Sequence, residues 1–93
     1  MPVREARKGY LESIPELVVE IRSKNDTAAY VERKVQDYLT AGVGTIVVID
    51  PVSRTANVFR SSGAPTIVQE REALDLKDTI PGFQLIVGQL FGE

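Results

Sequence analysis

The residues whose types and spacing could do chemistry lie between positions 16 and 38. Glu20 interrupts the apolar run Leu17–Ile21, and Lys34 follows in a segment with helical periodicity. Because an unpaired charge is costly in an apolar setting, Glu20 is expected to be ion-paired, bound to a metal, or placed at the open end of a sheet. This is the most chemically suggestive feature of the chain.

The composition limits the kinds of chemistry that are possible. The 93-residue chain has a net charge of -2 and contains neither histidine nor cysteine. A Ser-His or Cys-His arrangement is therefore excluded, as are disulfides and thiolate metal sites. Any metal must be held by carboxylates, which points to Mg²⁺ or Mn²⁺. A net charge of -2 is not typical of nucleic-acid-binding domains, which usually carry an excess of basic residues on one face.

The hydropathy pattern indicates a cytoplasmic protein with no membrane partner. No stretch reaches the length of apolar sequence that a membrane-spanning helix needs, and the N-terminus lacks the apolar core of a signal peptide. Residues 1–13 read as an N-terminal arm, and residues 14–93 as one domain.

The apolar run around Glu20 predicts a β-strand. Alternation places Val18, Glu20 and Arg22 on one face of this strand and the odd-numbered apolar residues on the other. Apolar residues on both faces predict a central strand that is covered on both sides.

The next segment, Thr27 to Ala41, predicts a helix with Asn25 or Asp26 as its N-terminal cap and Gly42 as its terminator. The predicted buried stripe consists of Ala28, Val31, Val35, Tyr38 and Leu39. The β-branched run Thr45–Ile49 predicts a buried strand parallel to the first, which completes a βαβ unit. Further segments predict an antiparallel strand over 55–60, a short strand over 66–69, a turn or half-strand over 73–76, and a last strand after Pro81-Gly82.

The order of these segments resembles a known family. The segments are PELVVEIRS, NDT, VERKVQDYLTAGVGTIVVIDP, RTANVFR and IPGFQLIVGQLF. Together they resemble the Uma-two family of putative restriction endonucleases, bacterial proteins of the PD-(D/E)XK nuclease-like superfamily. The similarity runs from about Gly9 to Phe91.

The resemblance implies an α/β fold of the restriction-endonuclease type, with a mixed sheet, a βαβ unit and antiparallel strands after it. It also implies Mg²⁺-dependent hydrolysis of DNA phosphodiester bonds. The family's strand glutamate corresponds to Glu20, the serine after it to Ser23, and the helix lysine and tyrosine to Lys34 and Tyr38. Arg22 occupies the place of the superfamily's strand lysine, which leaves Lys34 as the catalytic cation.

The second metal ligand is not evident. Glu16 shares the face of Glu20 but stands about 13 Å away along the strand. Asp26, Asp50 or another subunit are the remaining sources. Each of these residues could also have a purely structural role. Glu20 could form an ion pair with Lys34 or Arg22, Tyr38 could pack in the hydrophobic core, and the hydroxyl of Ser23 could form hydrogen bonds within a turn.

The chain is about half as long as the family's usual members and is expected to lack their N-terminal portion, which brings an acidic residue. Two functions follow: a metal-dependent endonuclease, or a catalytically silent relative that serves as a binding or oligomerisation module. A shortened sheet is expected to leave an edge uncovered and to form a homodimer or larger homo-oligomer.

Overall fold

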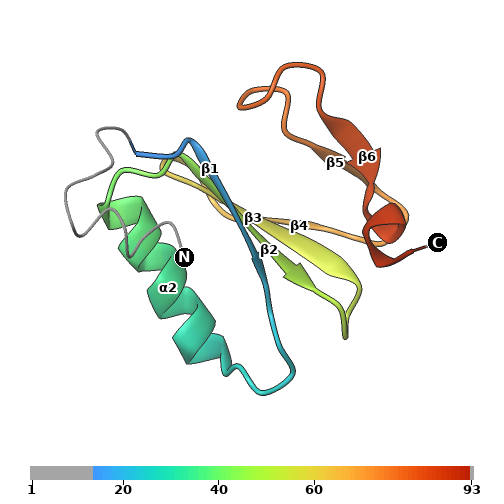
Figure 1. Ribbon diagram of the computed structural model, residues 1–93, viewed down its shortest axis with the longest axis horizontal. Helices are drawn as coiled ribbons and strands as arrows, with labels where there is room; N and C mark the ends of the chain where they lie inside the picture. Colours follow the sequence, from blue (N-terminus) through green and yellow to red (C-terminus); the bar gives the residue numbers. More distant parts are fainter. Residues whose placement is uncertain (1–13, 93) are drawn as a thin grey trace.

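The fold is a mixed four-stranded sheet with a helix on one face and a β-hairpin on the other (Figure 1). The computed structural model describes residues 14–92, so the predicted arm over 1–13 lies outside the described residues. The elements, in chain order, are β1 (Leu17–Ile21), α2 (Ala28–Thr40), β2 (Thr45–Asp50), β3 (Thr55–Arg60), β4 (Thr66–Val68), β5 (Ala73–Asp75), β6 (Gln84–Ile86) and the 3₁₀-helix η1 (Val87–Phe91). Among the described helices, none has the length and apolarity needed to span a bilayer.

The main sheet has the strand order β1-β2-β3-β4. β1 and β2 are parallel, with Leu17 opposite Thr45 and Ile21 opposite Ile49, and α2 connects them. β3 and β4 continue the sheet in antiparallel pairing. The predicted βαβ unit, followed by antiparallel strands, is therefore confirmed.

Side-chain alternation in the sheet produces two hydrophobic clusters, one on each face. The face toward α2 buries Val35, Tyr38, Val43, Ile46 and Val48. The face toward the β5–β6 hairpin and η1 buries Val47, Ile49, Ala56, Val58, Val68, Leu74, Leu76 and Val87. Because β2 contributes to both clusters, its run of β-branched residues is buried on both sides, as expected of a central strand.

Helix α2 begins one residue later than predicted and uses a different cap. The N-cap is Thr27, whose Oγ1 accepts a hydrogen bond from the Tyr30 N–H at 3.0 Å. The prediction of Asn25 or Asp26 was wrong because the Asp26 carboxylate accepts from the Ser23 N–H at 2.9 Å instead, inside the preceding turn. Gly42 has φ 103° and ends the helix in the predicted left-handed conformation.

The helix buries a narrower stripe than predicted. Val35 and Tyr38 are buried and Val31 and Leu39 half-buried, whereas Ala28 is exposed. Ala28 lies in the first turn of α2, so the packed part of the stripe begins one turn further along the helix.

The position of β1 also differs from the prediction. Within the described part of the chain, β1 is an edge strand that pairs only with β2. Val19 and Ile21, on the face away from α2, are 54% and 70% exposed, because the hairpin-side cluster reaches only Leu17 of this strand. The prediction of a central strand covered on both sides was therefore wrong for β1 within residues 14–92.

The C-terminal strand is shorter than the alternation of Phe83, Leu85 and Val87 predicts. β6 ends at Ile86, and Val87 begins the 3₁₀-helix η1. The Val87 N–H donates to the Glu72 carbonyl and the Gly88 N–H donates to the Glu70 carbonyl, which starts the 3₁₀ turn.

Substitution of two isoleucines compares what a core position and an exposed strand position contribute to the free energy of unfolding. Ile46 is fully buried beneath α2, whereas Ile67 on β4 is 58% exposed. We expect Ile46→Ala to lower the free energy of unfolding by about 2–5 kcal/mol, because it leaves a cavity. Ile67→Ala should cost less than about 1 kcal/mol. Urea denaturation of both variants measures the difference, and equal losses would contradict the packing of the helix-facing core.

Candidate functional site

The central contact of the candidate site joins β1 to α2. Glu20 Oε1 accepts a hydrogen bond and ion pair from Lys34 Nζ at 2.9 Å, and Glu20 Oε2 accepts a hydrogen bond from the Tyr38 hydroxyl at 2.7 Å. Lys34 and Tyr38 are four residues apart and so project from the same side of the helix. Both oxygens of the one carboxylate are therefore engaged by one helix face.

The protonation of the two helix residues is shifted by this contact. The pKa of Lys34 is raised above its usual value, chiefly because its ammonium donates to the Glu20 carboxylate. The pKa of Tyr38 is also raised, first by burial and then by its hydrogen bond to Glu20. At neutral pH both groups keep their protons, so Lys34 is a fixed positive charge and not a general base.

Tyr30 is a further member of the site that the sequence reasoning missed. The Lys34 ammonium lies 5.5 Å from the centroid of the Tyr30 ring, in the range of a cation–π contact. Tyr30 precedes Lys34 by four residues, and this spacing is the signal that could have found it. It was overlooked because its ring is half-exposed and lies outside the buried stripe.

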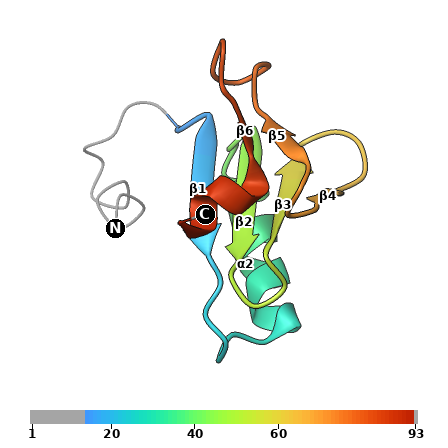
Figure 2. The same cartoon turned by 90° about the vertical axis from the view of Figure 1, so that its right-hand side faces the viewer.

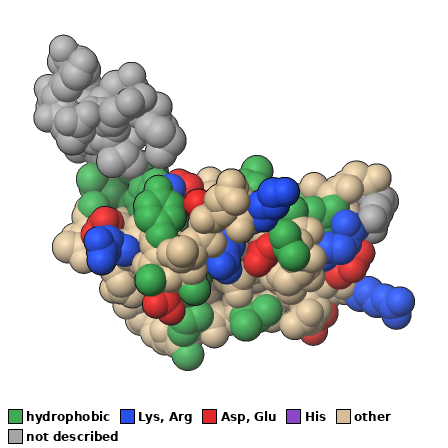
Figure 3. Space-filling view, turned by 90° about the horizontal axis from the view of Figure 1, so that it is seen from below, with side chains coloured by type: hydrophobic (Ala, Val, Ile, Leu, Met, Phe, Trp, Pro, Cys, Tyr) green, Lys and Arg blue, Asp and Glu red, His purple; other side chains and the backbone are tan. Residues whose placement is uncertain are grey.

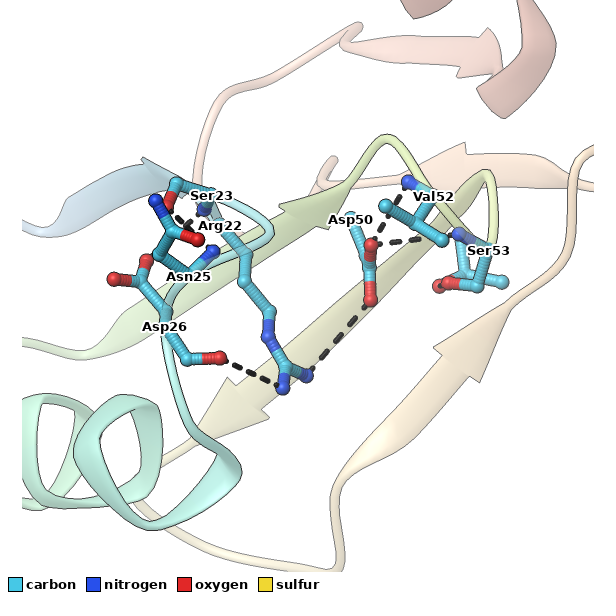
Figure 4. Close-up of polar contacts among 8 residues, drawn as sticks. Arg22, Ser23, Asn25, Asp26, Asp50, Val52 and Ser53 are labelled. Carbon is cyan, nitrogen blue, oxygen red and sulfur yellow. Dashed lines mark hydrogen bonds and ion pairs between the residues drawn. The ribbon is translucent and has the colours of Figure 1, made fainter.

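Arg22 lies between two acidic residues just beyond the end of β1 (Figure 4). One guanidinium nitrogen is 3.8 Å from the Asp50 carboxylate, and the other donates to the Asp26 backbone carbonyl at 3.2 Å. Asp50 also accepts from the Val52 N–H at 3.0 Å, which is the expected turn chemistry. Parallel pairing of β1 and β2 brings Arg22 and Asp50 to the same end of the sheet.

Ser23 is held in the turn that follows. Its N–H donates to the Asp26 carboxylate, and its hydroxyl accepts from the Asn25 N–H at 3.1 Å. The hydroxyl of Ser23 therefore organises the turn, in keeping with its structural interpretation.

A small pocket collects most of the predicted site residues. It has a volume of about 20 Å³, close to the room that one water molecule needs. Its lining includes Glu20, Arg22, Asp26, Lys34 and Tyr38. Glu16, in contrast, lines a separate hollow at the opposite end of β1, together with Arg60 and Asp78.

These donors can be compared with what a hard cation requires. In residues 14–92 no three carboxylates gather into one metal-binding group. Of the acids considered as second ligands, Asp26 lines the same pocket as Glu20, whereas Glu16 and Asp50 do not. Mg²⁺ commonly binds one or two carboxylates and completes its octahedron with waters and substrate phosphates. Glu20 and Asp26 are the two acidic residues that line the pocket, so a cation held there would have to complete its coordination with waters or a substrate phosphate.

Charge on the visible molecular surface is mixed in sign. Figure 3 shows acidic and basic side chains interspersed on the face it presents, without a continuous basic stripe. Several charged side chains of the described residues form ion pairs, such as Arg60 with Asp78 at 2.9 Å. A DNA ligand would therefore gain little from broad electrostatic attraction to this face.

The chain matches the sequence profile of one protein family, and its fold matches that of a solved structure. The profile of the family described as "putative restriction endonuclease" (Uma2) matches residues 2–88. A solved structure of a putative nuclease belonging to DUF820, from Anabaena variabilis, matches with a TM-score of 0.74 and 20% sequence identity. The match covers 84% of this chain and 44% of that one, so the chain spans less than half the length of that protein. No curated protein matches the sequence.

The Glu20 contacts predict how stability depends on pH. The raised pKa values of Lys34 and Tyr38 mean that the native state holds their protons more tightly than the unfolded state. Their contribution is complete below the unfolded values of about 10 and is lost as the pH rises through the folded values. We expect Glu20→Gln to cost about 1 kcal/mol at neutral pH, a modest figure because Lys34 is partly exposed.

The measurement is the free energy of unfolding of wild type and Glu20→Gln between pH 7 and 11.5. The two curves should converge above about pH 10. The variant Asp78→Asn, which removes an exposed carboxylate from a different ion pair, should show no such convergence. If the two curves stayed parallel over this pH range, the contacts of Glu20 with Lys34 and Tyr38 would not be the source of the stability difference.

Proposed function

The chain belongs to the Uma2 family of putative restriction endonucleases, and from this premise we propose that it hydrolyses DNA phosphodiester bonds with the help of Mg²⁺ or Mn²⁺. The observation that carries the proposal is the Glu20 carboxylate, which sits in a solvent-accessible pocket with the Lys34 ammonium 2.9 Å away. A carboxylate that can bind a hard cation and a neighbouring ammonium group are two of the elements that this reaction class uses, and a second carboxylate ligand is the third.

Each residue has a distinct proposed role. Glu20 is the metal ligand, with Asp26 as the second carboxylate of the pocket. Tyr38 positions Glu20 through the 2.7 Å hydrogen bond to its second oxygen. Bound metal would polarise the phosphoryl group and lower the pKa of the attacking water.

Lys34 supplies charge stabilisation. Its raised pKa keeps the ammonium protonated at neutral pH, so it can offset the negative charge that develops on the phosphoryl oxygens. Arg22, on the wall of the same pocket, is placed to hold a neighbouring phosphate if its 3.8 Å contact with Asp50 opens. Ser23 assists by holding the turn that presents Asp26.

A second function is favoured by a specific observation. Both oxygens of Glu20 are already bonded within the chain, and the pocket offers only two carboxylates. This arrangement also suits a catalytically silent relative in which Glu20, Lys34 and Tyr38 form a structural contact. Such a protein would act as a binding or oligomerisation module.

Metal titration and DNA cleavage distinguish the two functions. We expect Mn²⁺ or Mg²⁺ to bind wild type by calorimetry and Glu20→Gln to abolish binding, because the principal ligand loses its charge. Asp78→Asn is the matched control, since this acid is also ion-paired but lies outside the pocket. Lys34→Met should retain metal binding and lose about 10²–10³-fold in cleavage rate of a supercoiled plasmid.

The opposite results favour the silent relative. Absence of saturable metal binding, or binding that Glu20→Gln leaves intact, would remove Glu20 as the ligand. Metal binding without cleavage of single- or double-stranded DNA would contradict the hydrolytic function and leave a metal-dependent binding module.

A further inference from the structure

The outer edge of β1 combines two features that invite a partner. Within residues 14–92 the strand pairs on one side only, and in Figure 2 it lies at one margin of the sheet. Val19 and Ile21 on its hairpin-side face are 54% and 70% exposed. β1 has exposed β-branched residues and no internal proline or lysine, and its one charged residue, Glu20, faces α2 and is already paired with Lys34.

We propose that this edge binds the β1 edge of a second copy of the chain, in antiparallel pairing about a two-fold axis that passes through Val19. The reason is the symmetry of the segment from Glu16 to Arg22, which reads E-L-V-V-E-I-R. Around Val19, Leu17 falls opposite Ile21 of the second copy. Glu16 falls opposite Arg22 of the second copy, and this pair occurs twice.

The faces of the two sheets match in this arrangement. A two-fold axis perpendicular to the sheet keeps the helix side of one copy next to the helix side of the other. On the hairpin side, the two Val19 residues meet at the axis and each Ile21 lies opposite the half-buried Leu17 of the other copy, so the exposed Val19 and Ile21 side chains become mutually covered. On the helix side, Glu20 falls opposite Val18 and keeps its own Lys34 and Tyr38 partners.

Neighbouring registers are disfavoured by charge. An axis at Val18 would place Glu16 directly opposite Glu20, and an axis at Glu20 would place the two Glu20 residues opposite each other. Like charges in directly opposed positions are destabilising. Shifts that pair odd with even positions would set the helix side of one copy against the hairpin side of the other.

The other edge of the sheet is a weaker candidate. β4 contains three residues, Thr66–Val68, and short edge strands are one way in which proteins avoid pairing. Ile67 is nevertheless 58% exposed there, which makes it a suitable control position. Because a five-residue strand pair is small beside a standard interface of about 1,600 Å², we expect a dimer that dissociates in the micromolar range.

Cross-linking tests the register. The chain contains no cysteine, so a single introduced thiol is unique. Directly opposed residues of antiparallel strands have Cα atoms about 4.5–5.5 Å apart, within the range that a disulfide can bridge. Val19→Cys should therefore form a covalent dimer under mild oxidation at micromolar concentration. Ile67→Cys, equally exposed on the other edge, should remain a monomer on a non-reducing gel.

Sedimentation equilibrium tests the surface. Wild type should show a concentration-dependent dimer, and Val19→Lys should be monomeric while it keeps the wild-type circular dichroism spectrum. Glu16→Arg should weaken the dimer at least tenfold, because it places two arginines opposite each other. Ile67→Lys and Glu32→Arg, which change exposed residues elsewhere, should dimerise like wild type.

Three outcomes would overturn the proposal. One is a wild type that stays monomeric at high micromolar concentration. Another is a dimer that Val19→Lys leaves intact, which would place the interface elsewhere. The third is equal cross-linking of the two cysteine variants.

Discussion

A charged carboxylate set into an apolar strand is the constraint on which the arrangement of β1 and α2 depends. Glu20 can occupy its position because each of its oxygens receives a hydrogen bond, one from the Lys34 ammonium and one from the Tyr38 hydroxyl. A part-buried acid with only one partner would leave its second oxygen to be satisfied by solvent alone. The pair of bonds therefore fixes the rotation of α2 about its axis as well as its distance from β1, and the apolar contacts of Val35 with the sheet are made in that same orientation.

The sequence was sufficient for the parts of the fold that depend on local patterns. The β-branched run in β2, the periodicity of α2 and the glycine at position 42 each correspond to one physical requirement, and the structure contains all three. The cap of α2 was misjudged because Asp26 and Thr27 are both good caps, and the choice depends on which one the preceding turn uses. The position of β1 in the sheet was misjudged because an apolar pattern reports what a strand can bury and not which neighbours it has.

In the candidate site, too, some contacts were predictable from the sequence and others were not. The pairing of Glu20 with Lys34 was expected from the residues themselves, whereas Tyr38 joined the predicted site only through the family resemblance and was otherwise assigned to the core. The contact of Arg22 with Asp50 and the ring of Tyr30 beside Lys34 could not be predicted, because they depend on strand register and on an exposed side chain. Of the acids considered as a further metal ligand, Glu16, Asp26 and Asp50, only Asp26 lines the Glu20 pocket. The 3.3 Å rise per residue of a strand accounts for the separation of Glu16.

The contacts that define the site also have a consequence for the order in which the molecule folds. Glu20 is separated from Lys34 by 14 residues and from Tyr38 by 18 residues, so its partners are local by the standards of a mixed sheet. Closure of such a short loop costs little chain entropy, and it can precede the docking of the β5–β6 hairpin on the sheet, which brings residues as distant in sequence as Val47 and Val87 into one cluster. The polar cluster then forms with the βαβ unit itself. Mutations in the C-terminal hairpin would change the late steps of folding and the rate of unfolding while leaving the assembly of the Glu20 cluster unchanged.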